Sequence, residues 1–185
     1  MDREKSAPKS RELLSKALFE SALIVFSILL ALAINEWKEN RDNQRLASQA
    51  LENFEREIQE NSGRVERSFP YHSHLSEAFK GARSLTEVEG WHGISSPMLQ
   101  DTAWQTALAT NAFGQIRYET VSALSRVYTS QKSLEKVADD VVASLVNQGL
   151  SDSTKGLMND LLIAETGLRS AYEQALKRIH AERHE

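Results

Sequence analysis

The sequence predicts an all-α protein, in which an N-terminal transmembrane helix continues into a stalk helix and an antiparallel helical bundle lies outside the membrane. Two observations lead to this prediction. The chain of 185 residues has only 8 glycines and 3 prolines, which favours helices over a turn-rich β architecture. Its apolar residues recur at spacings of three and four, which is the period of an amphipathic helix.

Composition narrows the class of protein further. Hydrophobic residues make up 41% of the chain and charged residues 26%, a balance that is typical of a folded domain. The formal net charge of -4 argues against nucleic acid as a partner. Cysteine is absent, which excludes disulfides, thiolate metal sites and thiol catalysis.

An apolar run over residues 21–34 passes into a charged stretch without a Gly or Pro. A membrane-spanning helix needs about 20 mostly apolar residues. A segment over 13–35 meets this length. It includes the charged residues Lys16 and Glu20, which are tolerated because they lie near its end, where long side chains reach the headgroups. Trp37 stands where an interfacial aromatic anchor belongs. We therefore expect a transmembrane helix over 13–35, after a short cytoplasmic tail over 1–12.

Two alternatives to an anchor remain open: a cleaved export signal and a core helix of a soluble protein. A signal would use the basic start and Ala31-Leu32-Ala33 as its cleavage site. Signal peptidase needs an extended substrate, whereas the sequence beyond Ala33 continues as helix.

Lys and Arg are more frequent in residues 1–16 than in 36–50. This bias predicts a protein of the bacterial inner membrane with its N-terminus in the cytoplasm and the rest of the chain in the periplasm or another extracytoplasmic space.

The stalk is expected over 36–68 as a continuation of the same helix, before Pro70. Its apolar residues fall at spacings of four, three, four and seven, with Asn61 interrupting the stripe; they are Ala47, Leu51, Phe54, Ile58 and Val65. Such a stripe packs inside the chain's own bundle, or pairs with a second copy as a short coiled coil. The first interpretation is favoured, because a stripe of this length is short for a free coiled coil.

The bundle is expected over 69–185. A short helix near 75–83 and a loop over 87–96 come first, and a helix over 98–112 follows, which starts at Ser95 or Ser96 and ends at Gly114. A helix over 118–147, with Gln131 interrupting its apolar face, is closed by Gly149. The last helix is capped by Ser151 or Ser153, so the two long helices form an antiparallel hairpin.

One face of the apolar helix is unexpectedly polar or small. At 100° per residue one third of the circumference carries Lys16, Glu20, Ser27, Ala31 and Asn35. Ser27 and Ala31 form a small-xxx-small pair, which lets another backbone approach closely. We expect this face to contact a second transmembrane helix, from another copy or from another membrane protein. The alternative is that the end residues reach the headgroups and that Ser27 bonds to a backbone carbonyl.

The sequence contains few residue patterns that are typical of catalytic, cofactor or metal sites. The sequence has no nucleophile elbow, phosphate-binding loop, dinucleotide fingerprint or zinc-protease helix, so we expect neither an enzyme nor a cofactor. His72, His74 and His92 are better explained as polar surface than as a metal site. The large aromatics Tyr118, Tyr128, Tyr172, Trp91 and Trp104 are expected in the core and at its rim, with an aromatic ligand pocket as the alternative.

Two stretches resemble a family of bacterial single-pass membrane proteins that is known only as a domain of unknown function. In residues 19–61 an apolar helix runs into an Asn-x-Trp-x-x-x-Arg segment, here Asn35, Trp37 and Arg41, and then into an amphipathic helix. In residues 101–131 a Trp-containing helix, a Gly-containing turn and a Leu-x-x-x-Tyr helix match at Trp104, Leu124 and Tyr128. The resemblance implies an inner-membrane anchor with a helical domain, and it implies no activity or functional residue.

These observations favour a membrane-anchored interaction or scaffold protein whose partners are the lipid bilayer and either itself, as a homo-oligomer, or another membrane protein. The alternative is an extracytoplasmic helical bundle that senses a ligand and signals through a partner. Residues 1–12 are too short for an output domain of their own.

Overall fold

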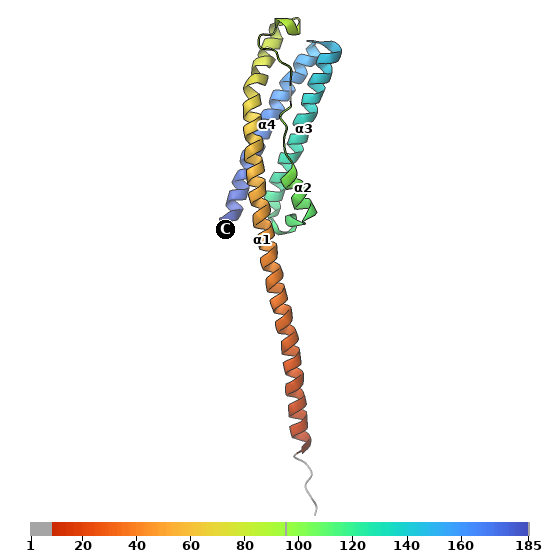
Figure 1. Cartoon of the computed structure of the whole chain (residues 1–185), viewed down its shortest axis with the longest axis vertical. Helices are drawn as coiled ribbons and strands as arrows, with labels where there is room; N and C mark the ends of the chain where they lie inside the picture. The colour runs from red at the N-terminus through yellow and green to blue at the C-terminus, as the bar shows by residue number, and fades with distance from the viewer. Residues whose placement is uncertain (1–8, 95, 185) are drawn as a thin grey trace, which may run out of the picture. The chain divides into compact units, whose positions relative to one another are not determined.

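The structure is a computed structural model that describes residues 9–94 and 96–184, with side chains from Ser15 onward. Within these ranges the chain forms four α-helices and two short 3-10 helices, and no strand, so the all-α prediction is confirmed (Figure 1). The expected cytoplasmic tail over 1–12 lies outside the described residues, apart from the helical backbone of 9–12. The chain divides into two compact units, Met1–Arg45 and Leu46–Glu185, and we call the second the helical domain.

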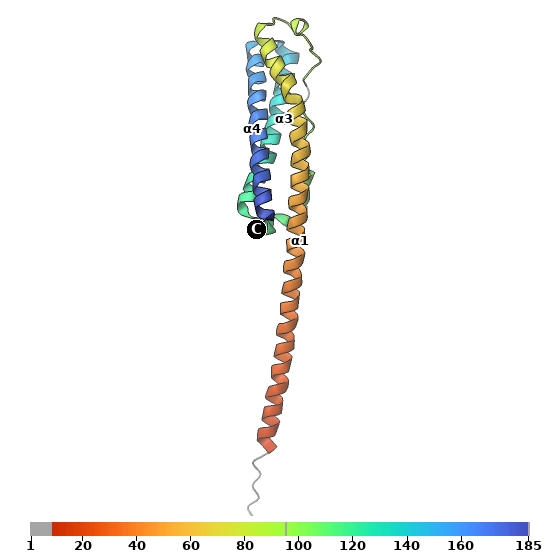
Figure 2. The same cartoon turned by 90° about the vertical axis from the view of Figure 1, so that its left-hand side faces the viewer.

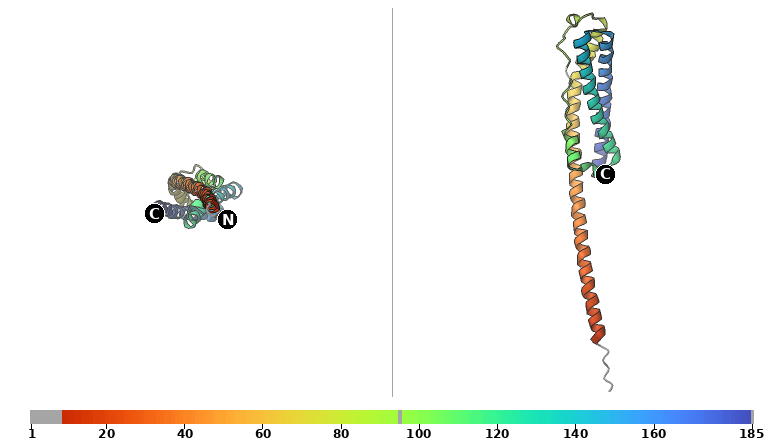
Figure 3. Two further views of the ribbon diagram at one scale, coloured as in Figure 1. Left: turned by 90° about the horizontal axis from the view of Figure 1, so that it is seen from below. Right: turned by 90° about the vertical axis from the view of Figure 1, so that its right-hand side faces the viewer.

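Three long helical segments make up the helical domain: the second half of α1 (Lys9–Gly81), α3 (Tyr118–Gln148) and α4 (Asp152–Arg183). They lie side by side, and α3 and α4 form the expected antiparallel hairpin (Figures 2 and 3). The predicted stripe of α1 is buried inside the domain, with Ala47, Leu51, Phe54, Ile58 and Val65 all between 0% and 8% exposed. The stripe is therefore covered by the chain's own helices, as the first interpretation expects.

Helix α1 continues well beyond the predicted end of the stalk at residue 68. It passes through Gly63 and Pro70 and ends at Gly81. An interior proline removes one backbone hydrogen bond and costs about 3 kcal/mol. The helix persists because the turns after Pro70 bury Leu75 and Phe79 completely, and each such side chain contributes about 1.5–3 kcal/mol. The expected separate helix near 75–83 is thus the last part of α1.

The chain between α1 and α3 is less helical than expected. The 3-10 helix η1 covers Leu85–Glu87, the stretch over 96–101 is not helical, and α2 covers only Thr102–Ala109. The predicted helix over 98–112 is therefore too long at both ends. Asn111 has a φ of 56°, a left-handed conformation that ends helices, and Gly114 lies inside the 3-10 helix η2, Ala112–Gln115. Ser95 is outside the described residues.

The turn between α3 and α4 agrees closely with its sequence pattern. Gly149 follows α3 with a φ of 61°, which a residue without a Cβ adopts at low cost. Ser151 caps α4, because its Oγ accepts a hydrogen bond from the backbone N–H of Thr154 at 3.2 Å. Thr154 is itself buried and donates its hydroxyl to the carbonyl of Gly149 at 2.7 Å. The turn is consequently fixed by local chemistry.

Candidate functional site

The first candidate site is the apolar part of α1 that precedes the helical domain. Its large side chains are exposed by 49% to 71% and touch no core; they are Leu18, Phe19, Leu23, Ile24, Val25, Phe26, Ile28, Leu29, Leu30, Leu32 and Ile34. Exposing so many apolar groups to water is unfavourable, whereas a lipid environment solvates them. Within the described residues this is the one helix long and apolar enough to cross a membrane.

The predicted contact face lies along this segment. Lys16, Glu20, Ala31 and Asn35 are all exposed in the part of the chain that the structure describes. Ser27 is also exposed, and its Oγ donates to the carbonyl of Leu23 at 2.8 Å. That bond is the one named by the alternative interpretation, and it satisfies the hydroxyl inside an apolar environment. It leaves the small size of Ser27 and Ala31, and hence the contact prediction, unaltered.

The expected interfacial anchor is exposed and has a cationic neighbour one turn later. Trp37 is 63% exposed, and the guanidinium carbon of Arg41 lies 5.5 Å from the centre of its ring. A guanidinium at this distance is attracted to the face of an indole ring. Both side chains suit the boundary between lipid and water, where an apolar body and a polar tip are solvated together.

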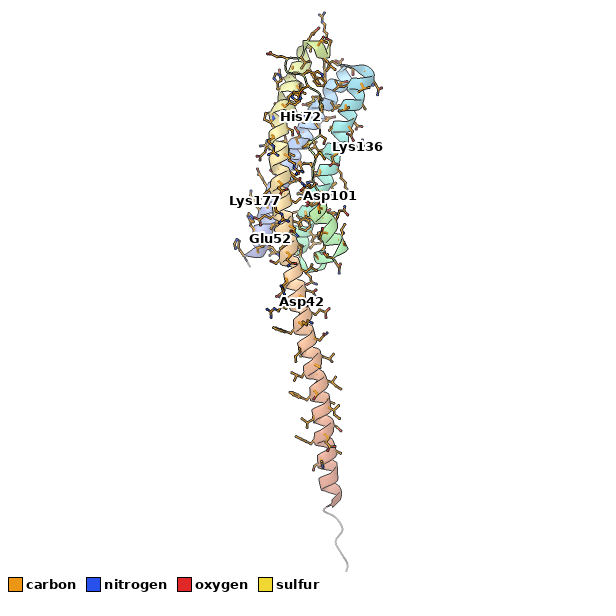
Figure 4. The ribbon with its side chains drawn as sticks, in the orientation of Figure 1. Asp42, Glu52, His72, Asp101, Lys136 and Lys177 are labelled. Carbon is orange, nitrogen blue, oxygen red and sulfur yellow. The ribbon has the colours of Figure 1, made fainter. Side chains whose placement is uncertain are left out.

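The second candidate site is a set of buried polar side chains inside the helical domain. Glu57 of α1 is only 7% exposed, and its two carboxylate oxygens serve different elements. Oε1 accepts the hydroxyl of Tyr128 on α3 at 2.6 Å, and Oε2 accepts the backbone N–H of Ala103 in α2 at 2.8 Å. One buried carboxylate therefore joins α1 to both α2 and α3. Figure 4 labels Asp101, which precedes α2, and Glu52 on α1.

Asn61, which interrupts the predicted stripe, is fully buried and holds the stretch before α2. Its Nδ2 donates to the carbonyl of Gln100 at 2.7 Å, and its Oδ1 accepts the N–H of the same residue at 3.0 Å. Arg64, one turn later, donates from Nη1 to the carbonyl of Met98. The carbonyls of Met98 and Gln100, which a helix starting at residue 98 would use, are thus engaged by side chains of α1, and α2 begins only at Thr102.

His72 forms a buried pair with Glu165 of α4. The side chains are 1% and 0% exposed, and Nδ1 of His72 lies 2.7 Å from Oε1 of Glu165. Ser68 Oγ lies 3.1 Å from the same oxygen, while Oε2 of Glu165 is buried with no hydrogen-bond partner among the described residues. His72 is labelled on α1 in Figure 4. The pair ties α1 to α4, and the expectation that His72 belongs to the polar surface is wrong; His74 and His92 are exposed.

Two further buried contacts join α3 to α4. Gln131, which interrupts the predicted face of α3, is 3% exposed and donates from Nε2 to the hydroxyl of Tyr172 at 3.0 Å. Ser144 and Thr154 share a hydroxyl hydrogen bond of 2.7 Å. The residues that break the apolar pattern are thus hydrogen-bonded partners between helices, and such contacts fix the register of packed helices.

Burial determines the ionisation of the two core tyrosines. It raises the pKa of Tyr128 far above the ordinary value, and the neighbouring Glu57, as hydrogen-bond acceptor and negative charge, raises it further. Burial likewise raises the pKa of Tyr172, against the opposing hydrogen bond from Gln131. Both phenols are therefore neutral over the physiological range, Tyr128 as the donor to Glu57 and Tyr172 as the acceptor from Gln131. The expectation for the aromatics holds for Trp91 and Trp104, which are half-buried, while Tyr118 is 80% exposed.

A signal for the missed buried residues was present in the sequence. The three-and-four spacing of the stripe continues beyond Val65 through Ser68, His72, Leu75 and Phe79. Gly63 and Pro70 obscured it, because each is taken as a helix end. Following the spacing through them places His72 on the buried face.

Over the residues that the structure describes, these features define the class of protein: all-α, with a folded helical domain and one N-terminal helix long and apolar enough to cross a membrane. Comparison with known proteins finds no match, whether among family models, curated protein sequences or solved structures.

Proposed function

We propose that this chain is a single-pass bacterial membrane protein whose helical domain is an interaction or scaffold module of the envelope. One observation carries the proposal: an unpacked apolar segment belongs to the same continuous helix, α1, that contributes the buried stripe of the folded domain. The hydrocarbon core of a bilayer solvates the apolar side chains of that segment, and the continuous helix α1 then attaches the helical domain to the membrane.

The anchor interpretation is preferred to a cleaved signal for a geometric reason. Ala31, Leu32 and Ala33, the residues of the candidate cleavage site, lie inside α1, and the helix continues without a break on both sides. Peptidase cleavage needs an extended backbone, so this conformation supports retention of the segment in the mature protein. We propose that the protein lies in the inner membrane with its N-terminus in the cytoplasm, because Lys and Arg are more frequent before the apolar segment than after it.

The partner surface that we propose in the membrane is the face of Lys16, Glu20, Ser27, Ala31 and Asn35. The support is its chemistry: small residues let a second helix approach, and polar residues gain hydrogen-bond partners there. The partner is another copy or another membrane protein. The family resemblance of the segment with Asn35, Trp37 and Arg41 belongs to the same proposal and adds no activity to it.

Membrane extraction tests the anchor. After alkaline carbonate treatment of isolated membranes, the full-length chain is expected in the pellet, and N-terminal sequencing is expected to start before residue 13. The double substitution Phe26→Lys/Leu29→Lys places two charges in the apolar segment, each costing about 2.5–3.5 kcal/mol at mid-bilayer, and is expected to release protein into the supernatant. A mature chain that begins at Ile34, or quantitative release of the wild type, contradicts the anchor.

Purification in mild detergent tests the interaction role. The tagged chain is expected to elute as a stoichiometric complex, with itself or with one membrane protein, and Ser27→Leu/Ala31→Leu is expected to dissociate it. The control Val25→Leu changes the opposite side of the helix and is expected to leave the complex intact. A wild-type chain that elutes as a monomer contradicts the role.

A second candidate function, ligand sensing through a partner, is supported by one observation in the helical domain. An open pocket of about 430 Å³ on the surface of the domain is lined in part by His72, which forms the buried pair with Glu165.

A further inference from the structure

The pocket beside His72, called the cavity below, is open to solvent and is lined mainly by basic and hydrogen-bonding side chains. Its volume is about 430 Å³, and its polar lining comprises Arg64, Arg67, Ser68, Tyr71, His72 and His92. None of the described lining residues is acidic. In a protein whose net charge is -4, two guanidiniums in one lining are a local concentration of positive charge, and the nearest carboxylate, that of Glu165, lies behind His72 and Ser68 and is engaged by them.

The rim of the cavity is held in place by specific contacts. The rings of Tyr71 and His92 are stacked, with centroids 4.0 Å apart and planes 11° from parallel. The hydroxyl of Tyr71 donates to the carbonyl of Gly93 at 2.9 Å and accepts the N–H of His92 at 3.2 Å. These three contacts position His92 relative to α1, so the imidazole is preorganised at the cavity wall.

The two arginines differ in what they already bind. Arg64 donates from Nη1 to the carbonyl of Met98, which fixes the direction of its guanidinium. Arg67 is exposed and makes no hydrogen bond or ion pair with the residues that the structure describes. Its fork of N–H donors is therefore open to a ligand, and this fork matches the two oxygens of a carboxylate or phosphate.

His72 connects the cavity with the interior. Its Nδ1 is engaged by Glu165 at 2.7 Å, so Nε2 is the ring nitrogen left for a ligand. A ligand that reaches Nε2 would contact the same ring that Glu165 engages through Nδ1. An occupant of the cavity would thus act on the pair that joins α1 to α4.

We propose that this cavity binds a small anionic molecule through a carboxylate or phosphate group, with Arg64 and Arg67 holding the oxyanion and His72 and His92 in the wall beside it. The inference extends the second candidate function and does not depend on the membrane anchor, whose test is extraction from membranes. A failure of one therefore leaves the other measurable.

Isothermal titration calorimetry on the full chain in detergent tests the site, with inorganic phosphate and succinate as separate probes at constant ionic strength and chloride as the blank. We expect saturable binding of at least one probe. Arg67→Gln is expected to weaken it about 10- to 100-fold, the usual effect of losing a charge-assisted hydrogen bond, because this side chain has no internal partner to lose. Arg45→Gln removes the same charge from another exposed position of α1 and is expected to leave the affinity unchanged.

Each outcome decides the proposal. Tighter binding of phosphate assigns a phosphorylated ligand, tighter binding of succinate assigns a carboxylate ligand, and either supports the site when Arg67→Gln weakens it. The absence of saturable binding of both probes overturns the proposal. Equal weakening by Arg67→Gln and Arg45→Gln also overturns it, because the binding would then reflect overall charge.

Discussion

The hydroxyl of Tyr128 on α3 donates to Oε1 of Glu57 on α1 at 2.6 Å, inside the core of the helical domain. The ring centre of Tyr128 lies 6.0 Å from that of Phe54 and 5.2 Å from that of Trp104, and Phe113 packs against both of these rings. A carboxylate in such an apolar setting is stabilised by its hydrogen bonds, here from Tyr128 and the N–H of Ala103. The contact has consequences for stability at neutral and alkaline pH.

Tyr128→Phe is expected to lower the free energy of unfolding by about 1–3 kcal/mol at neutral pH, because Oε1 of Glu57 loses its donor while it stays buried. Thermal unfolding of the full chain in detergent, followed by circular dichroism, measures the loss. Tyr118→Phe is the matched control, since the hydroxyl removed there belongs to a side chain that is 80% exposed. Equal losses in the two variants would show that the buried contact adds nothing.

The same residues predict a loss of stability in alkali. The pKa of Tyr128 and that of Tyr172 are raised by burial in the fold, whereas an unfolded tyrosine ionises near pH 10. Above that pH the unfolded chain releases protons that the folded chain keeps, so the free energy of unfolding falls as pH rises. Tyr128→Phe is expected to make this fall shallower, as measured by the unfolding midpoint from pH 9 upward. A parallel fall in the variant and the wild type would contradict the assignment.

The pair of His72 and Glu165 is expected to behave as a unit. His72→Leu or Glu165→Leu alone leaves a buried polar partner and is expected to cost about 3–5 kcal/mol. The double substitution is expected to cost clearly less than the sum, in a cycle measured by urea unfolding. The exposed pair of Lys136 and Asp140, replaced by alanines, is the control, with an expected coupling of about 0.3–0.5 kcal/mol. Additive costs at the buried pair would refute its coupling.

Glu55 predicts a stability change in acid. The hydrogen bond from His180, with Nε2 2.8 Å from Oε1, lowers the pKa of Glu55; burial opposes it, and the charges of His180 and Arg183 add to the lowering. Below about pH 4.5 the unfolded carboxyl takes up a proton before the folded one does, so stability is lost as pH falls through the lowered pKa.

Glu55→Gln removes this titration and is expected to flatten the decline of the unfolding midpoint between about pH 5 and pH 3. Glu52→Gln, which neutralises an exposed carboxylate one turn earlier on α1, is expected to leave the decline as steep as in the wild type. Indistinguishable curves for the two variants would remove Glu55 from the account of acid stability.

The contact face of the apolar segment predicts a pattern of crosslinks. Because the chain contains no cysteine, single cysteines report on one position each. In membranes, Ser27→Cys and Ala31→Cys are expected to give disulfide-linked dimers, or adducts with a partner, in higher yield than Val25→Cys and Leu29→Cys on the opposite side of the helix. Equal yields on both sides would argue for a helix surrounded by lipid alone.

The sequence determined by itself those features of the protein that depend on local periodicity and on turn chemistry. The stripe from Ala47 to Val65 predicted a buried helix face, and Gly149 with Ser151 predicted the hairpin of α3 and α4. The apolar run over 21–34 predicted a helix able to cross a membrane. Each signal lies within a few residues of the structure that it specifies.

Tertiary structure decided what depends on partners far along the chain. Only packing keeps Pro70 inside a helix, because the burial of Leu75 and Phe79 outweighs the lost hydrogen bond. The amide of Asn61, 39 residues away, bonds to both backbone groups of Gln100, which lies outside α2. His72 likewise became a core residue through Glu165, 93 residues distant. Periodicity shows which face of a helix is buried, whereas a polar residue on that face is explained only by the partner that the fold brings to it.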